Sequence, residues 1–147
     1  MIDMELLLKQ IESIIDKDIP LVSNLSNISA LLFTMEDINW AGFYLAKGET
    51  LYLGPFQGEV ACTIIPFGKG VCGTSAIRKE TLVVDDVNTF KGHIACSEKS
   101  RSEIVVPIIK DNKVVAVIDI DSPIYNRFTR EDADSLEEIA NFLVTIF

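Results

Sequence analysis

The sequence predicts an α+β domain in which helices pack against an antiparallel sheet. Apolar residues recur at helical spacing near both ends of the chain, and short apolar stretches separated by turn residues lie between them. Two helices, then hairpin-linked strands, then a closing helix is an order of elements typical of this fold class. A chain of 147 residues fits one domain, spanning 1–147, with a core large enough to need no disulfides.

Helices are expected at both ends of the chain. The first spans residues 4–15, where five apolar side chains share one face, and Pro20 follows it. A second helix is expected at about residues 21–35. The closing helix begins after Thr129, a typical N-cap residue, and runs to about residue 145.

Strands and tight turns fill the middle of the chain. Aromatic and β-branched residues mark the strands, and Lys47-Gly48-Glu49 and Lys110-Asp111-Asn112 mark two hairpin turns. The pattern leaves the order of the strands in the sheet open. The expected strands span residues 39–46, 50–56, 59–66, 81–84, 103–109 and 113–121, with a short helix at 71–78.

Charge and composition exclude several function classes. The net charge of −9 repels phosphate backbones and anionic membrane surfaces, so nucleic acid is not expected as a partner. No apolar run approaches the ~20 residues of a membrane span. The acidic start of the chain is unlike a signal peptide, and three cysteines make a poor disulfide framework for a secreted protein. We therefore expect a cytoplasmic protein.

Cys96 is the first candidate nucleophile. It lies in the long polar segment 85–100. Three side chains that can carry positive charge are close to it in sequence: His93, Lys99 and Arg101. Nearby cations stabilise a thiolate, which is the nucleophilic form of cysteine. The alternative is an ordinary loop thiol, because neighbours in sequence need not be neighbours in space.

Cys62 and Cys72 have less distinctive surroundings. Cys62 falls in an expected apolar strand, where a small buried core cysteine is the usual outcome. Cys72 begins a short helix, whose N-terminus favours a thiolate, although a small residue in a tight turn would also fit. The chain has no CxxC pair, and His93-x-x-Cys96 alone is a weak metal signal. No metal is therefore expected.

Acidic residues at the end of an apolar strand are the second unusual feature. Asp119 and Asp121 follow Val114–Ile118 and point to the same face, because strand side chains alternate. Burying two like charges is costly unless a cation lies between them. Glu103, in the adjacent hairpin strand, can converge on the same place. The alternative is that the strand ends there, with both aspartates solvated or capping the turn before Pro123.

Trp40 and Tyr44 are the third feature. In a strand they share one face with Gly42, which would leave space between the two rings. An aromatic wall of this kind suits a methyl group or a cation, whereas core packing is the commoner use of such residues. Together the three features describe one pocket, with an aromatic wall, carboxylates for an ammonium group and a reactive thiol with two candidate resolving thiols.

The sequence resembles the free methionine-(R)-sulfoxide reductase family over nearly its whole length. Three cysteines at these spacings make the resemblance specific, since a generic GAF domain would share only the fold pattern. The matching stretches are Trp40–Tyr44, Gly68–Gly73, Gly92–Cys96, Glu103–Pro107 and Asp119–Pro123.

The resemblance implies a GAF-like antiparallel six-stranded sheet flanked by helices and an enclosed pocket. Free methionine-(R)-sulfoxide would bind in that pocket, and peptide-bound methionine sulfoxide would be too large to enter. No cofactor is implied, and thioredoxin or a similar dithiol would be the reductant. Analogy at the level of the fold also admits a homodimer.

The resemblance also implies roles for the three cysteines. Cys96 matches the catalytic cysteine, which would attack the sulfoxide and become a sulfenic acid. Cys62 matches the partner that closes a disulfide with it. Cys72 matches a third cysteine, whose part in resolving the sulfenic acid is left open.

The pocket residues have counterparts in the family as well. Trp40 and Tyr44 match aromatic residues near the substrate methyl group. Glu103, Asp119 and Asp121 match an acidic cluster that holds the substrate ammonium and helps to protonate the sulfoxide oxygen. Protonation is needed because that oxygen is otherwise a poor leaving group.

Two functions of another class compete with the enzyme. One is a sensory GAF domain that binds a small ligand and regulates a partner, but a cyclic nucleotide would be repelled by the acidic cluster. The other is a thiol redox sensor in which Cys96 oxidises directly and Cys62 or Cys72 resolves it. Turnover of free methionine sulfoxide separates the enzyme from both.

Overall fold

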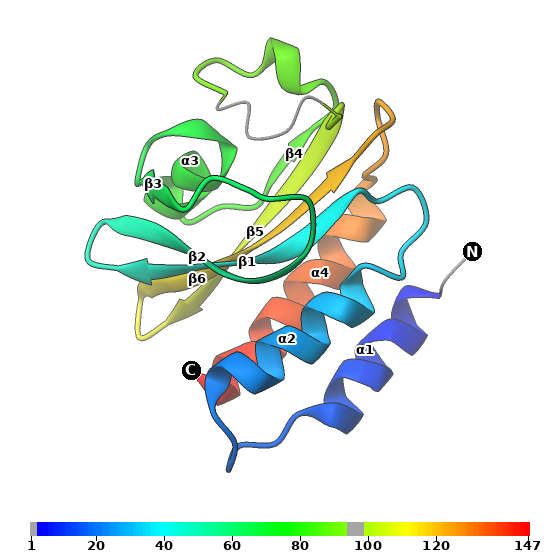
Figure 1. The fold of residues 1–147 in the computed structure, drawn as a ribbon, viewed down its shortest axis with the longest axis vertical. Coiled ribbons are helices and arrows are strands. Elements are labelled where there is room, and N and C mark those ends of the chain that lie inside the picture. The colour runs from blue at the N-terminus through cyan, green and yellow to red at the C-terminus, as the bar shows by residue number, and fades with distance from the viewer. Residues whose placement is uncertain (1–2, 94–98) are drawn as a thin grey trace.

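The computed structural model describes residues 3–93 and 99–147, which form a six-stranded antiparallel sheet with helices on both faces (Figure 1). The strand order across the sheet is β3-β2-β1-β6-β5-β4. This architecture confirms the expected fold class. The elements are α1 (Met4–Ile14), α2 (Leu21–Leu32), β1 (Trp40–Lys47), β2 (Thr50–Gly58), β3 (Ile64–Pro66), α3 (Gly70–Arg78), β4 (Leu82–Val84), η1 (Val87–Thr89), β5 (Ser102–Lys110), β6 (Lys113–Ser122), α4 (Arg130–Leu143) and η2 (Val144–Ile146).

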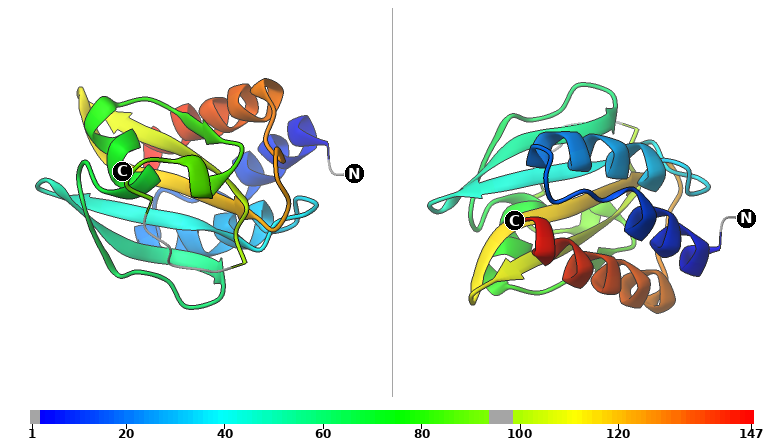
Figure 2. Two further views of the ribbon diagram at one scale, coloured as in Figure 1. Left: turned by 90° about the horizontal axis from the view of Figure 1, so that it is seen from above. Right: turned by 90° about the horizontal axis from the view of Figure 1, so that it is seen from below.

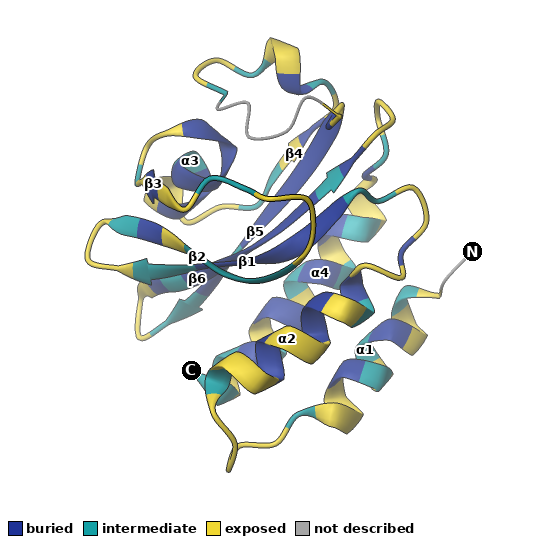
Figure 3. Cartoon of the chain, in the orientation of Figure 1, coloured by how far each residue is buried: buried dark blue, intermediate teal, exposed yellow. Residues whose placement is uncertain are grey.

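One face of the sheet is covered by α1, α2 and α4, which pack together there (Figures 1 and 2). The apolar stripes of these helices meet alternate residues of the central strands, such as Phe43 of β1 and Ile118 of β6. Both side chains are fully buried. Figure 3 shows the same division, with buried residues on the sheet-facing side of each helix and exposed residues on the outer side. We call this side the helix face.

The opposite face of the sheet carries α3, which packs against β5 and β6 (Figure 2). The remaining alternate residues of the central strands point here, including Tyr44, Val105 and Val117. They form a second, smaller apolar cluster with α3. We call this side the α3 face.

A tight turn and a bulge set the register of the central hairpin. Asp111 and Asn112 both have positive φ, at 51° and 64°, as a two-residue hairpin turn requires. The pairing of β5 with β6 then shifts between Ile108 and Ile109. Because of that shift, Glu103 lies opposite Asp121 and points to the same face.

Sequence signals at the helix ends are confirmed for α4. The Thr129 hydroxyl accepts a hydrogen bond from Asp132 N at 3.1 Å, and Asp132 Oδ2 accepts one from Thr129 N at 2.9 Å. This capping box satisfies two backbone N–H groups that would otherwise lack partners. Within residues 3–93 and 99–147, no helix has the length and apolarity needed to cross a membrane.

The expected strand at residues 59–66 is wrong in its first half. The chain leaves the sheet at Gly58, where φ is 135°, and pairing resumes only at Ile64. Residues 59–63 form a loop whose Val60 is 88% exposed, although its apolar and β-branched residues are typical of a strand. Cys62 is therefore a half-buried loop residue rather than a core strand residue. We call residues 59–63 the Cys62 loop.

Candidate active site

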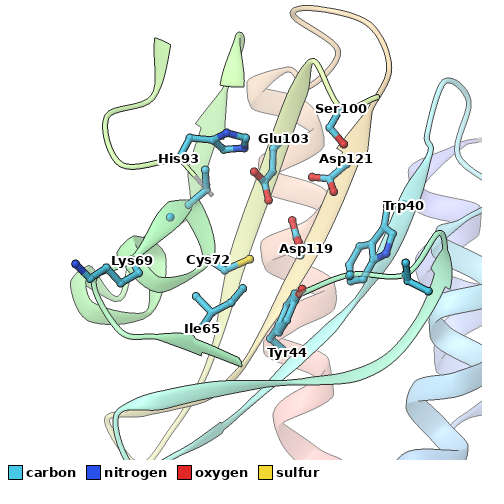
Figure 4. Close-up of a pocket in the computed structure, with 14 residues that line it drawn as sticks. Trp40, Tyr44, Ile65, Lys69, Cys72, His93, Ser100, Glu103, Asp119 and Asp121 are labelled. Atoms are coloured by element: carbon cyan, nitrogen blue, oxygen red, sulfur yellow. The ribbon is translucent and has the colours of Figure 1, made fainter. Parts of the chain in front are cut away.

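A narrow cavity of about 50 Å³ opens on the α3 face, between α3, the Cys62 loop and the ends of β1, β5 and β6 (Figure 4). Side chains from segments far apart in the sequence meet there. The lining residues are Trp40, Tyr44, Val60, Ala61, Ile65, Lys69, Gly70, Val71, Cys72, His93, Ser100, Glu103, Asp119 and Asp121.

The structure brings Glu103, Asp119 and Asp121 together, as strand alternation predicts (Figure 4). Glu103 and Asp119 are only 7% and 5% exposed, and Asp121 is half-buried. The alternative of solvated aspartates at a strand end is therefore wrong, since β6 continues to Ser122. Asp119 Oδ1 has no hydrogen-bond partner among the described residues. An unpaired buried acceptor costs free energy, so this atom is suited to a donor supplied by a ligand.

Burial raises the pKa of all three carboxyl groups. The pKa of Glu103 is raised well above its usual value by burial and then by the charges of Asp119 and Asp121. The pKa of Asp121 is raised well above its usual value by burial and by Asp119. For Asp119, burial raises the pKa, while hydrogen bonds with Glu103 and Cys72 oppose the shift. Three carboxylates this close cannot all ionise, so the cluster retains a proton at neutral pH.

Cys72 lies beside this acidic cluster as a free, buried thiol (Figure 4). Its Sγ and one carboxylate oxygen each of Glu103 and Asp119 lie within 4.8 Å of one another. Burial, and then the charge of Asp119, raises the pKa of the Cys72 thiol well above its usual value. The prediction that the N-terminus of α3 favours a thiolate at this position is therefore wrong, because burial and three carboxyl groups outweigh the helix dipole.

A glycine holds α3 close to the sheet. A Cβ atom on Gly73 would lie 2.5 Å from the backbone oxygen of Pro66, closer than real contacts allow. The Gly68 N–H donates to Gly73 O at 2.8 Å and closes the loop before the helix. This close approach places Cys72 over β5 and β6.

The structure describes only one of the other two cysteines. Cys62 is disulfide-bonded in this structure, in the half-buried loop described above. Cys96, the candidate nucleophile, lies outside the described residues.

Trp40 and Tyr44 form one wall of the cavity, as predicted (Figure 4). Their rings are stacked with centroids 5.9 Å apart. The space at Gly42, however, is not part of the cavity. It is taken by Phe56 of β2, because a Cβ atom on Gly42 would lie 2.3 Å from Phe56 Cβ. The Phe56 ring stacks on Trp40 with centroids 5.1 Å apart.

The two wall residues also hold the Cys62 loop. Trp40 Nε1 donates to Glu59 O at 3.1 Å, and the Tyr44 hydroxyl donates to Cys62 O at 2.9 Å. Burial, and then the charge of Asp119, raises the pKa of Tyr44 far above its usual value, so the phenol keeps the proton that it donates. The aromatic wall and the loop that carries the disulfide-bonded Cys62 are therefore joined.

Comparisons with known proteins place this arrangement in a family. The GAF domain family model matches residues 21–146. The free methionine-R-sulfoxide reductase of Saccharomyces cerevisiae is 50% identical over 149 residues, which cover 95% of this chain and 83% of that protein. The chain belongs to the free methionine-R-sulfoxide reductase family. It is therefore an oxidoreductase built on a GAF domain.

Solved structures of the family superpose closely on this one. The reduced form of fRMsr of Staphylococcus aureus has a TM-score of 0.93 and 50% identity, covering 98% of this chain and 94% of that chain. The free methionine-R-sulfoxide reductase from Neisseria meningitidis, in complex with its substrate, has a TM-score of 0.93 and 44% identity, covering 98% and 87%.

Three further residues line the cavity although they were not among the site residues expected from the sequence: Ser100, His93 and Lys69. Ser100 is buried and accepts a hydrogen bond from Asn39 Nδ2 at 3.3 Å, but nothing in its local sequence marks it. His93 lines the cavity, whereas its sequence context marks it as a neighbour of Cys96 and as part of a weak metal pattern. Burial lowers its pKa, and the charge of Asp119 opposes that shift. Lys69 precedes α3 and points its ammonium away from the acidic cluster (Figure 4).

Proposed function

We propose that this protein reduces free methionine-(R)-sulfoxide to methionine with its own cysteine thiols. The observation that carries the proposal is the unpaired, buried Asp119 Oδ1 inside a cavity with two further carboxyl groups and an aromatic wall. Such a cavity requires a small ligand with a cationic donor. The relative from Neisseria meningitidis, whose structure is of a complex with its substrate, supports the same assignment.

The substrate ammonium is held by the acidic cluster. Glu103, Asp119 and Asp121 repel one another when they ionise, so a cation bound among them relieves that repulsion. Trp40 and Tyr44 contact the methyl group, because a flat apolar wall suits a small apolar substituent. The cavity is narrow and lies between α3 and the Cys62 loop, so we expect it to exclude a flanking peptide chain and to restrict the substrate to the free amino acid.

The cluster also supplies the acid. A carboxyl group whose pKa is raised stays protonated at neutral pH and can transfer that proton to the sulfoxide oxygen. The transfer turns a poor leaving group into a good one. Water is excluded from this proton because Glu103 and Asp119 are buried.

The Cys96 thiolate is the nucleophile. It attacks, and the protonated sulfoxide oxygen passes to Cys96, which becomes a sulfenic acid while the substrate leaves as methionine. Cys62 then condenses with the sulfenic acid, so that a disulfide forms and water departs. The disulfide state of Cys62 supports this role, and the buried, protonated thiol of Cys72 is less suited to it.

A dithiol reductant, thioredoxin, restores the two thiols by exchange with the disulfide. This cycle places the enzyme in the cytoplasm, where thiols are kept reduced. We propose that residues 1–147 form one GAF-type domain, for which analogy at the level of the fold admits a homodimer.

The test is consumption of methionine-R-sulfoxide by the purified protein, with thioredoxin or dithiothreitol as reductant. The wild type is compared with Cys96→Ser and, as a matched thiol control, with Cys72→Ser. The S epimer and a peptide-bound methionine sulfoxide are assayed beside the free R epimer. We expect turnover of the free R epimer alone and its loss in Cys96→Ser.

Two outcomes would contradict the proposal. Turnover that persists in Cys96→Ser would move the nucleophile to another cysteine. No turnover by folded, reduced wild type would leave a binding or redox-sensing GAF domain in place of the enzyme.

A further inference from the structure

Cys72, Glu103 and Asp119 form a cluster that the proposed reaction uses only in part. One atom from each, the Cys72 Sγ and two carboxylate oxygens, lies within 4.8 Å of the others. All three residues are buried, and they come from three different elements, α3, β5 and β6. The proposed reaction requires the carboxyl groups and gives the thiol no necessary role.

An independent observation points to a ligand among them. Asp119 is 95% buried, lines the cavity, and its Oδ1 has no hydrogen-bond partner in the part of the chain that the structure describes. Figure 4 shows the Cys72 sulfur and the Asp119 carboxyl directed into the same space. The cavity therefore presents a thiol and two carboxyl groups, and one carboxyl oxygen, Asp119 Oδ1, lacks a hydrogen-bond donor.

The separations are close to those of a tetrahedral metal site. Ligand atoms on one zinc ion, at about 2.3 Å for sulfur and about 2.1 Å for oxygen, are about 3.4–3.6 Å apart. To reach this spacing from separations of up to 4.8 Å, the three atoms need to close by at most about 1.2–1.4 Å, which a change of carboxylate torsion achieves.

We propose that Cys72, Glu103 and Asp119 bind a thiophilic divalent cation of the zinc class inside the substrate cavity. A thiolate with two carboxylates is a donor set for zinc or cobalt rather than for magnesium or calcium, which take oxygen ligands alone. Water takes the fourth position. Binding displaces the Cys72 thiol proton and the proton held by the carboxyl groups, and both leave to solvent.

The bound cation occupies the place of the substrate ammonium. Glu103 and Asp119 cannot hold both, so the cation and methionine sulfoxide compete. Zinc of this kind is an inhibitor of the enzyme rather than a cofactor, since it removes the proton that the sulfoxide oxygen needs. The inhibition rests on the proposed function, whereas the binding does not.

Cobalt(II) is the probe for binding, because a thiolate bound to cobalt gives a charge-transfer absorption in the near ultraviolet. The chain has three cysteines, so the Cys62→Ser/Cys96→Ser double variant retains Cys72 as its one thiol. Proteins are reduced with a phosphine, freed of it by gel filtration, and titrated with cobalt. We expect the absorption in wild type and in the double variant and its loss in Cys72→Ser.

The carboxyl ligands are tested by affinity. Asp119→Asn and Glu103→Gln should each weaken cobalt binding by at least about tenfold, and zinc should displace cobalt from wild type. Circular dichroism checks that each variant is folded. If the double variant does not fold, Cys96→Ser and Cys62→Ser replace it as single variants, because each retains Cys72, which is a free thiol in this structure. Absorption that persists in Cys72→Ser, or that is missing when Cys72 is the sole thiol, overturns the site.

Inhibition is measured by single turnover of pre-reduced enzyme, because a dithiol reductant would itself bind zinc. Zinc should raise the substrate concentration needed for half-maximal rate without changing the rate at saturation, and a chelator should reverse the effect. In Cys72→Ser, the zinc concentration needed for inhibition should rise at least about tenfold. An unchanged inhibition constant in Cys72→Ser would place the inhibitory zinc on other thiols. If cobalt binding nevertheless requires Cys72, that result would refute the competition with substrate but not the metal site.

Discussion

The two faces of the sheet are built from the same strands and both carry apolar clusters, but among the described residues the buried carboxyl groups lie on the α3 face alone. On β6, Ile118 and Ile120 point to the helix face and are fully buried among apolar side chains. Asp119 and Asp121, between and after them, point to the α3 face and line the cavity. Strand alternation alone separates them. In this part of β6, the even-numbered residues pack in the core and the odd-numbered residues line the cavity.

The faces also differ in what they do for the free energy of folding. The helix face stabilises the protein through burial of apolar side chains from α1, α2, α4 and the sheet. The α3 face holds three carboxyl groups whose pKa values are raised by burial and mutual repulsion, which destabilises the fold at neutral pH. In the proposed function, the substrate ammonium offsets that cost when it binds. Variants on the two faces should therefore affect different measured quantities.

The largest effect is expected for Asp119→Asn. The change keeps the shape of the side chain and removes a carboxyl group of the acidic cluster, which is the proposed partner of the substrate ammonium. We expect kcat/KM for methionine-R-sulfoxide to fall by about 10²–10⁴-fold. Asp134→Asn, at an exposed position on α4, is the matched control and should retain full activity. Near-normal turnover by Asp119→Asn would remove this residue from the reaction.

On the helix face, Ile118→Ala should act on stability instead. Ile118 is fully buried, and its truncation leaves a cavity that should lower the free energy of unfolding by about 2–5 kcal/mol. Urea denaturation measures the loss, with Ile118→Val as the smaller step of about 0.5–1.5 kcal/mol. Activity per folded molecule should stay near that of wild type. A tenfold loss of kcat in folded Ile118→Ala would show that the two faces are not independent.

Glu103→Gln should raise stability while lowering activity. The pKa of Glu103 is higher in the folded protein than in the unfolded chain. Its ionisation therefore lowers the free energy of unfolding as the pH rises from the usual pKa of a carboxyl group through its pKa in the folded state. Removing the charge should therefore stabilise the protein by about 0.5–2 kcal/mol at pH 8 and by less at pH 5. Thermal unfolding at both pH values measures the difference. A gain that is larger at the lower pH would contradict the sign of the shift.

The smallest effect is expected for Thr129→Ala, which removes the N-cap of α4 on the helix face. The free energy of unfolding should fall by about 1 kcal/mol. Thr129→Ser, which keeps the hydroxyl, should retain most of the stability. Neither variant should change KM for the sulfoxide, and a change in KM would mean that α4 influences the cavity through the sheet.

Sequence reasoning could predict the fold and much of the cavity because both depend on periodicity. Alternation put Asp119 and Asp121 on one face, and the hairpin turn put β5 beside β6. The meeting of Glu103 with Asp121 depends in addition on the bulge near Ile108. Without it, Glu103 would lie opposite Ile120 and point to the helix face. Pro107 lies next to the bulge, but a proline within a strand is equally typical of an edge position, so the sequence alone does not place the bulge.

The parts that sequence reasoning missed depend on contacts between distant segments. The Cys62 loop has the composition of a strand, but hydrogen bonds from Trp40 and Tyr44 hold its backbone outside the sheet. The space beside Gly42 is taken by Phe56, a residue of the neighbouring strand. Local sequence likewise favours a thiolate at Cys72, whereas burial against β5 and β6 decides its protonation.

The bond from Trp40 Nε1 to Glu59 O has an optical consequence. Trp40 is the one tryptophan of the chain, it stacks on Tyr44, and it anchors the loop that carries Cys62. Indole fluorescence depends on the polarity around the ring and on the partner of its N–H group. The emission of this single tryptophan is therefore expected to change when a ligand binds in the cavity and when the Cys62 loop moves. Stopped-flow fluorescence of the unlabelled wild type can thus resolve ligand entry from disulfide exchange in real time.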